Sequence, residues 1–264
     1  TNGSGYYKLN VPHEGNWVVQ ADSSLLTPLR KLVKKDQGTD QSINSRFDRN
    51  TNLAAVTVTA DVPAGRYNLP NVNAGFYNVP QLDLADQVLH VGDSATTVTP
   101  SLLSPVDPTN PVVNYGIATG APTDLVSATG SGAVSGTLVP QKTGITTVRL
   151  TTDDGYGELI TKDVKVTVWA DVKYDGNGAD SGSISANGEQ LYPSTTAAGA
   201  DAHTDETTAK SSAGTAGVDT QLVRAGYYFD GWNTKPDGTG TAYAAGAAIK
   251  TGKIDGDLTL YAVW

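Results

Sequence analysis

The sequence predicts a mostly β protein, and three observations lead to this fold class. Gly is abundant, with 29 residues in the 264-residue chain, which indicates many turns. Val/Thr-rich segments recur along the chain and favour extended structure. Several of these segments lie about ten residues apart, with turn residues between them. We therefore expect three β-rich domains, at residues 1–85, 86–168 and 169–264, the first of which carries one short helix.

The short helix is predicted to begin after Thr27 and to end near Gly38. Thr27 is a good N-cap, and Pro28 is a good first helical residue. One side of this helix is apolar, and the other side carries four cations: Arg30, Lys31, Lys34 and Lys35. This positive patch on an acidic chain is either a solvated helix face or an assembly contact with the acidic surface of another copy.

A short internal repeat closes the first domain, after a predicted strand at residues 53–60. Residues 67–72 read Tyr-Asn-Leu-Pro-Asn-Val, and residues 77–82 read Tyr-Asn-Val-Pro-Gln-Leu. Pro in a strand-like run is typical of an edge strand or an extended arm. The repeat predicts two edge strands of one sheet or, alternatively, segments that pair with another subunit. In the second interpretation, Tyr67 and Tyr77 are assembly contacts.

The middle domain has the plainest β pattern. Residues 163–168, Asp-Val-Lys-Val-Thr-Val, alternate polar and apolar side chains, and short strands with intervening turns predict a β-sandwich. The start at Val91-Gly92-Asp93, the Pro-containing turn at residues 104–108 and the Gly-x-x-x-Gly stretch at residues 132–136 resemble the bacterial Ig-like domain, group 2. This resemblance implies an Ig-like β-sandwich, although residues 111–123 lack the usual Trp-Ser-Ser-x-Asn.

The third domain ends in two aromatic-rich β segments, which flank a Pro/Asp/Gly turn. Residues 225–234 contain Gly-Tyr-Tyr-Phe-Asp-Gly-Trp, and residues 257–264 end in Leu-Tyr-Ala-Val-Trp. Aromatic side chains supply the core of a small β domain. The strings Gly-Tyr-x-Phe-Asp-Gly-Trp and Leu-Tyr-Ala-x-Trp resemble the Listeria–Bacteroides repeat of bacterial surface proteins, and residues 172–178 resemble its first strand and turn. The resemblance implies a small β-grasp-like extracellular domain in which Trp232 and Trp264 are core residues.

An insertion relative to that repeat is predicted at residues 194–220. This stretch consists almost wholly of Ala, Gly, Thr, Ser and Asp. Such a composition buries too little apolar area to offset the entropy of ordering. We expect a long flexible surface loop, mobile unless a neighbouring subunit holds it.

Composition and charge argue against several classes of partner. The formal net charge of -9 disfavours nucleic acids and anionic membrane surfaces as partners. The absence of Cys removes disulfides and Cys-based zinc sites. No apolar run approaches the roughly 18 residues of a membrane span, so we expect no membrane insertion.

No catalytic arrangement stands out in the sequence. The three His residues, His13, His90 and His203, lie in different domains and lack the spacing of metal ligands. The Asp-rich stretches at residues 153–158 and 175–180 predict hairpin turns, with calcium sites as the alternative. No Gly-x-Ser-x-Gly elbow precedes a helix. We therefore expect no enzyme, no cofactor and no resident metal.

Carbohydrate binding is harder to dismiss, because exposed Trp and Tyr rings bind sugar rings by stacking. Core packing is the favoured interpretation of Trp17, and a ligand platform is the alternative.

The sequence as a whole predicts a non-enzymatic, extracellular structural protein. We expect a subunit of a bacterial surface layer, filament or adhesin, which associates with itself or with other surface proteins. One alternative is a structural protein of a bacteriophage virion, such as a capsid decoration or tail component. Another is a carbohydrate-binding accessory module.

Overall fold

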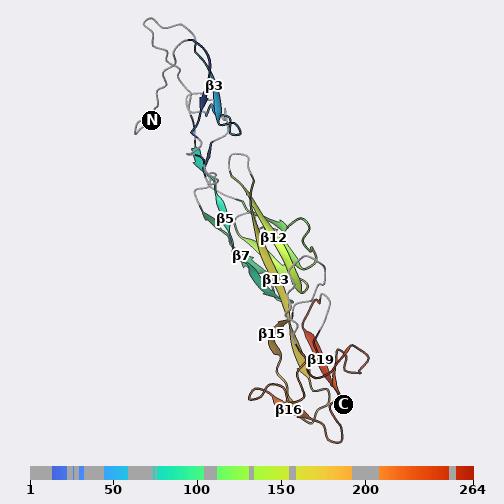
Figure 1. Ribbon diagram of the computed structural model, residues 1–264. Coiled ribbons are helices and arrows are strands. Elements are labelled where there is room, and N and C mark those ends of the chain that lie inside the picture. The colour runs from blue at the N-terminus through green and yellow to red at the C-terminus, as the bar shows by residue number, and fades with distance from the viewer. Residues whose placement is uncertain are drawn as a thin grey trace. The chain divides into compact units, whose positions relative to one another are not determined.

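The computed structural model describes residues 14–22, 26, 30–32, 45–58, 74, 76–103, 112–130, 134–154, 159–191, 208–249 and 254–264. These residues form strands and turns and contain no helix (Figure 1). The chain divides into two compact units. The N-terminal unit contains residues 1–81, 102–110 and 153–160, and the C-terminal unit contains residues 82–101, 111–152 and 161–264.

Residues 14–78 of the N-terminal unit contain two antiparallel two-stranded sheets in their described part. β1 (Gly15–Gln20) pairs with β3 (Leu53–Val58), and β2 (Arg30–Leu32) pairs with β4 (Phe76–Asn78). Two strands alone are marginally stable in water, so they need packing against other groups. A small core supplies this packing through four buried side chains: Ala21, Leu32, Phe47 and Ala54.

The predicted helix is wrong at the residues that the structure describes, because Arg30, Lys31 and Leu32 form β2 instead. Leu32 is 1% exposed, and Phe76 across the ladder packs against the same small core. Pairing and burial therefore override the local capping signals, which are a weak preference compared with tertiary packing. Residues 33–38 lie outside the described residues.

The middle of the chain supplies strands to two sheets of the C-terminal unit. A three-stranded sheet has the order β10-β11-β7, and β9, β12 and β6 belong to an eight-stranded sheet. Tyr115 of β9 connects the two, because its hydroxyl donates to the carbonyl of Val134 next to β11 (2.7 Å). The bounds are β6 (Gln87–His90), β7 (Thr96–Val98), β9 (Asn114–Ile117), β10 (Val126–Gly130), β11 (Gly136–Pro140) and β12 (Gly144–Asp153). β5 (Gln81–Asp83) and β8 (Ser101–Leu103) form a separate two-stranded sheet.

β13 (Leu159–Asp175) is a 17-residue strand that continues from the middle segment into the C-terminal segment. Its residues 166–169 pair in parallel with β6, and its residues 172–175 pair in parallel with β19 (Leu258–Val263). Alternate side chains from Val164 to Val172 are fully buried, as expected for a strand with one face in the core. The predicted boundary between residues 168 and 169 lies within this continuous strand.

The remaining strands form what we call the C-terminal module, residues 171–264. β17 lies between β18 and β19, and β19 pairs with β13 in the eight-stranded sheet. β15 also pairs with β13, and β14 pairs with β16 as a separate ribbon. The bounds are β14 (Ser181–Ser183), β15 (Asn187–Leu191), β16 (Thr220–Val223), β17 (Gly231–Asn233) and β18 (Ala242–Tyr243).

Candidate functional site

The core of the C-terminal module is built around Trp232. This residue lies on β17 between Ala262 and Tyr243 of the neighbouring strands, and it is 1% exposed. Its ring lies 4.7 Å from the ring of Tyr174 and 5.1 Å from that of Phe229, between ring centroids. Aromatic pairs at such separations add to the stabilisation that burial provides. The prediction that Trp232 is a core residue is confirmed.

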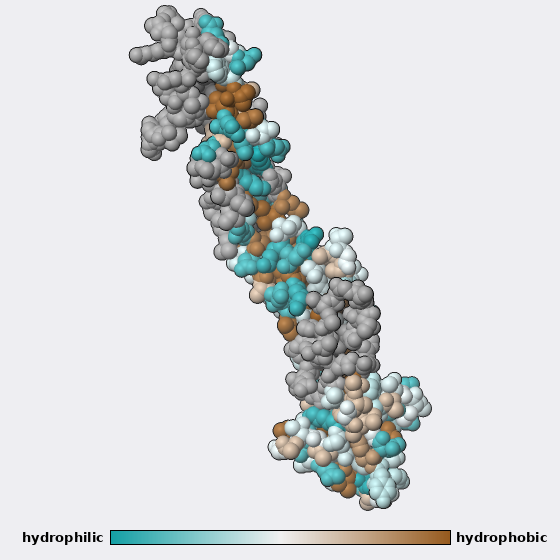
Figure 2. Space-filling view, in the orientation of Figure 1, coloured by the Kyte–Doolittle hydropathy of each residue, from teal (hydrophilic) through white to brown (hydrophobic). Residues whose placement is uncertain are grey.

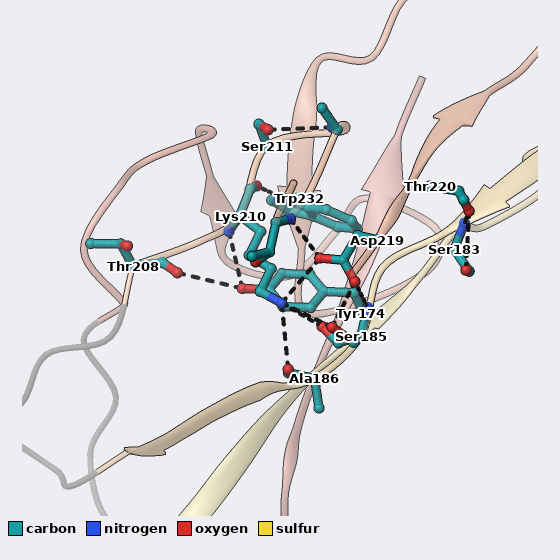
Figure 3. A network of polar contacts seen from close by, with 12 residues as sticks. Tyr174, Ser183, Ser185, Ala186, Thr208, Lys210, Ser211, Asp219, Thr220 and Trp232 are labelled. Carbon is teal, nitrogen blue, oxygen red and sulfur yellow. Dashed lines mark hydrogen bonds and ion pairs between the residues drawn. The ribbon is translucent and has the colours of Figure 1, made fainter. Parts of the chain in front are cut away.

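A polar network closes over this core (Figure 3). The Trp232 Nε1–H donates to the Lys210 carbonyl (2.6 Å), and the Lys210 backbone N–H donates to the Tyr174 hydroxyl (3.0 Å). The Lys210 ammonium donates to the Asp219 carboxylate (3.2 Å) and to the carbonyl and hydroxyl of Ser185 (both 3.1 Å). Lys210 thus connects the aromatic core to two separate loops of the module.

Asp219 is the central acceptor of this network, and its side chain is 1% exposed. The carboxylate accepts from the Ser185 hydroxyl (2.6 Å), the Ser185 backbone N–H (2.7 Å) and the Thr215 backbone N–H (2.6 Å), in addition to Lys210. These hydrogen bonds, above all the two from Ser185, hold the pKa of Asp219 well below its usual range. Asp219 is therefore ionised at neutral pH and acts as a structural acceptor.

The network corrects part of the predicted flexible insertion. Residues 194–207 lie outside the described residues, whereas residues 208–220 are held to the module by Lys210 and Asp219. Ala209, beside the lysine, is 2% exposed and belongs to the core. The composition of this stretch gave no indication that Lys210 and Asp219, nine positions apart, bind each other. Both also bind Ser185.

The Asp-rich turn after β13 is held by hydrogen bonds, but it is not the predicted hairpin turn, because the next strand, β14, pairs with β16 and not with β13. The Asp175 carboxylate accepts from the Asn177 backbone N–H (2.8 Å), and Asn177 has a left-handed φ of 45°. The Asn177 side-chain amide donates to the carbonyls of Pro236 (2.9 Å) and Ala262 (2.8 Å), which fixes the turn on the sheet. Residues 155–158 of the other Asp-rich stretch are not described, and the described residues contain no group of three or more His, Cys, Asp or Glu that could hold a metal ion.

A charged cluster lies where the middle segment meets the C-terminal module. His90, at the end of β6, directs Nε2 toward the Asp257 carboxylate (2.7 Å), and its ring lies edge-on to Trp169 at 4.5 Å. Asp257 also accepts from the Lys173 ammonium (2.6 Å) and from the Asp171 backbone N–H (2.8 Å). One carboxylate therefore joins β6, β13 and the segment before β19.

The pKa values in this cluster follow from burial and from these contacts. Burial alone raises the pKa of Asp257, but the hydrogen bonds from Lys173, the Asp171 backbone and His90 together outweigh it, so the pKa lies below its ordinary value. Burial raises the pKa of Asp171. The hydrogen bond to Asp257 raises the pKa of Lys173. His13 and His203 lie outside the described residues.

The structure brings together two of the predicted assembly residues. In the sheet formed by β2 and β4, Lys31 is the register partner of Tyr77, and Arg30 is the register partner of Asn78. The sequence had placed Lys31 on a helix and Tyr77 in a separate repeat, and nothing in it predicted that the two would pair. The remaining predicted assembly residues lie outside the described residues: Lys34, Lys35 and Tyr67.

Trp17, the candidate ligand platform, is half-buried on β1. It is two positions from Val19, which packs against the small N-terminal core, so both side chains lie on the same face of the strand. Val18 between them is 64% exposed. Part of the Trp17 ring is thus accessible, and its use as a ligand platform stays a prediction.

The sequence reasoning missed Tyr228, the most exposed aromatic side chain among the described residues of the C-terminal module. Tyr228 is 93% exposed and Tyr227 is 55% exposed. The next residue, Phe229, packs against the module core. Alternation along the chain could have identified Tyr228. Neighbouring side chains of an extended segment point to opposite sides, so an inward Phe229 implies an outward Tyr228.

In its described part, the C-terminal module is a small all-β domain, and internal polar contacts hold its loops at Lys210, Asp219 and Asn177. Residues 171–263 match the family model of the Listeria-Bacteroides repeat domain, a surface-associated bacterial module found in extracellular or surface proteins. The sequence resemblance is therefore confirmed for this part of the chain, and the resemblance of the middle segment to Ig-like domains stays a prediction. No curated protein matches the chain. In the part of the chain that the structure describes, no helix has the length and hydropathy of a membrane span.

Proposed function

We propose that the protein is a non-enzymatic structural subunit of a bacterial surface layer, filament or adhesin. The match of residues 171–263 to a surface-associated module carries this proposal, and it covers 93 of the 264 residues. The C-terminal module then acts as a spacer or an outward-facing decoration. The rest of the chain supplies the contacts that build the assembly.

The best-defined polar clusters support a structural role. Lys210 and Asp219 tie loops to an aromatic core, and Asp257 ties three segments together. A general acid or base has to exchange a proton with a substrate at working pH. The pKa values of Asp219 and Asp257 are lowered instead, and their oxygens are occupied by donors from the fold itself.

In this proposal the N-terminal unit supplies the assembly contacts. Its described sheets have two strands each, a size that gains stability from further pairing. A strand from a second copy would extend such a sheet through main-chain hydrogen bonds. The cation of Lys31 in β2 would also meet an acidic partner, since each copy carries a net charge of -9. A head-to-tail contact that does not close builds a filament or a lattice.

Electron microscopy and sedimentation velocity of the purified full chain, over a range of concentrations, test this proposal. We expect helical fibres or planar lattices that grow with concentration. Lys31→Glu should reduce the assembled fraction, whereas Lys235→Glu, the same charge change on an exposed turn of the C-terminal module, should leave it unchanged. Icosahedral or tail symmetry would instead support a virion protein, and a monomer at all concentrations would contradict self-assembly.

A further inference from the structure

We propose that the exposed pair Tyr227–Tyr228 is a binding site for a neutral saccharide. In this site a pyranose ring stacks on Tyr228, and its hydroxyl groups accept hydrogen bonds from Arg224 at the rim. The pair lies in the loop between β16 and β17 of the C-terminal module. This inference goes beyond the proposed structural role, because it needs no contact between copies of the chain.

Neighbouring residues force the Tyr228 ring into solvent. Phe229, the next residue, lies edge-on to Trp232 at 5.1 Å and to Trp264 at 5.9 Å. Because Phe229 is anchored in this aromatic cluster, Tyr228 on the other side of the chain is 93% exposed. Most of a large ring surface is therefore presented to solvent at a position that the module's packing fixes.

The loop that carries the pair is rigidly built. The Tyr227 backbone N–H donates to the Arg224 carbonyl (3.1 Å), and Gly226 has a left-handed φ of 79°, which residues other than Gly rarely adopt. The Ala225 backbone N–H donates to the Asp180 carboxylate (2.6 Å), which ties the loop to the turn after β13. A Tyr on such a base has only two side-chain torsions to restrict, so a ligand meets a preorganised surface.

Arg224 supplies hydrogen-bond donors next to the Tyr227 ring. Its guanidinium carbon lies 4.3 Å from the centroid of the Tyr227 ring, in cation–π contact. Gly178 faces the guanidinium and leaves room beside it, since a Cβ at that position would reach ordinary van der Waals contact, 3.6 Å from the guanidinium carbon. Among the residues that the structure describes, Arg224 forms no ion pair, and in this proposal its N–H groups are the donors of the site.

The size of the surface favours a small ring over a protein partner. One exposed ring and its half-exposed neighbour fall far short of the roughly 800 Å² that each side of a stable protein interface buries. On the side that Figure 2 shows, the C-terminal module carries small hydrophobic areas among neutral and hydrophilic ones, without a broad hydrophobic face. A hexose ring is about as large as one Tyr ring, so the two match in area.

Charge decides which saccharide fits. A net charge of -9 repels polyanions, including nucleic acids and acidic polysaccharides. The positive charge of Arg224 against the Tyr227 ring disfavours a cationic ligand on the same rings. A neutral pyranose avoids both repulsions. It offers an apolar C–H face to Tyr228 and hydroxyl acceptors to the guanidinium.

Affinity electrophoresis of the full chain through gels that contain soluble polysaccharide tests the inference. The probes are galactomannan, xyloglucan and dextran as neutral polymers and polygalacturonate as the anionic one. We expect retardation by at least one neutral polymer and none by polygalacturonate. Retardation by polygalacturonate alone, or by no neutral polymer, would overturn the proposal.

Matched variants then locate the site. Tyr228→Ala should lower the binding constant by about tenfold, as for a ligand-contacting aromatic, and Tyr228→Trp should preserve binding. Arg224→Gln should lower it by about threefold, and Lys235→Gln, which removes another cation of the module, should not change it. Unchanged binding in Tyr228→Ala, or loss of binding only in Trp17→Ala, would contradict the assignment. Tyr228→Ala should also assemble as the unmodified chain does, and loss of assembly with intact binding would make the pair a subunit contact instead.

Discussion

The C-terminal module and the N-terminal unit both place a Trp on a short strand, and they use it differently. Trp232 is 1% exposed, contacts two aromatic rings, and donates its N–H to a carbonyl at 2.6 Å. Trp17 is half-buried on a two-stranded sheet. The described core around Trp232 has nine buried residues, and the N-terminal one has four. The Trp in the larger sheet, with more buried neighbours and a hydrogen-bond partner for its N–H, therefore contributes more to the structure.

Polar groups widen this difference between the two regions. In the C-terminal module, Lys210 and Asp219 fix loops that have little apolar area of their own. In the described part of the N-terminal unit, a comparable role falls to Asp48, whose carboxylate accepts from the backbone N–H groups of Asn50 and Thr51 (both 2.9 Å) in one local turn. Long-range polar bonds thus extend the C-terminal core into its loops. In the N-terminal unit, Arg49 of the turn at Asp48 also makes one, from its Nε–H to the Leu32 carbonyl (3.0 Å).

The strongest test of the comparison is Trp232→Ala. Removal of a fully buried Trp should lower the free energy of unfolding by about 3–5 kcal/mol, because a cavity remains and the Lys210 carbonyl loses its donor. Urea unfolding followed by circular dichroism measures the change. Val18→Ala, at a 64% exposed position, is the control and should stay within about 0.5 kcal/mol. A fully stable Trp232→Ala protein that bound ligand less well would move this residue from packing to function.

Trp17→Ala should have a smaller effect on stability. The ring is partly buried, so its removal loses less buried apolar area than removal of Trp232 and should lower the free energy of unfolding by about 2 kcal/mol. The same urea titration measures it. Unchanged stability together with loss of saccharide binding would identify Trp17 as the ligand platform. Trp17 would then have a binding role and no structural role.

Asp219→Asn should produce a loss of stability that depends on pH. The pKa of Asp219 is lowered in the folded protein from an ordinary value of 3.8, so its contribution is complete above about pH 4. That contribution disappears as the pH falls through the lower folded-state pKa. The unmodified protein should therefore be more stable than Asp219→Asn at pH 7, and the gap should narrow below about pH 4 in thermal melts.

Asp230→Asn is the matched control for this experiment, since it removes one negative charge from an exposed position of the same module. It should give no comparable gap at pH 7. A gap for Asp219→Asn that persisted unchanged to pH 2 would show that its hydrogen bonds do not depend on its charge. Equal stabilities at pH 7 would show that the network does not stabilise the module.

Sequence reasoning succeeded where the signal was local and periodic. The alternation at residues 163–168 predicted part of β13, and the Gly-Tyr-x-Phe-Asp-Gly-Trp string identified Trp232 as core. It failed at Arg30–Leu32, where a good N-cap and Pro predicted a helix and pairing with β4 produced a strand. Helix capping contributes less free energy than the burial of Leu32 and Phe76, and this burial depends on extended structure.

The polar networks could not be predicted from the sequence. His90 and Asp257 are 167 residues apart and meet only because β6 and β19 both lie beside β13. Lys210 and Asp219 are close in sequence, yet their shared contact with Ser185 depends on where β16 runs. A single sequence carries no record of such contacts, because they follow from the topology of the sheet.

The smallest expected effect on stability is that of Tyr228→Ala. It allows an exposed aromatic side chain to be compared with a packed one, Phe229, at the next position. A side chain that is 93% exposed has little burial to lose, so the free energy of unfolding should stay within about 0.5 kcal/mol of the unmodified value. Phe229→Ala, one position further on, should lower it by about 2–4 kcal/mol, because that ring lies against Trp232 and Trp264. Thermal melts of the two variants measure the contrast. If Tyr228→Ala destabilised the module as much as Phe229→Ala, Tyr228 would be part of the packing and would not be free to bind a ligand.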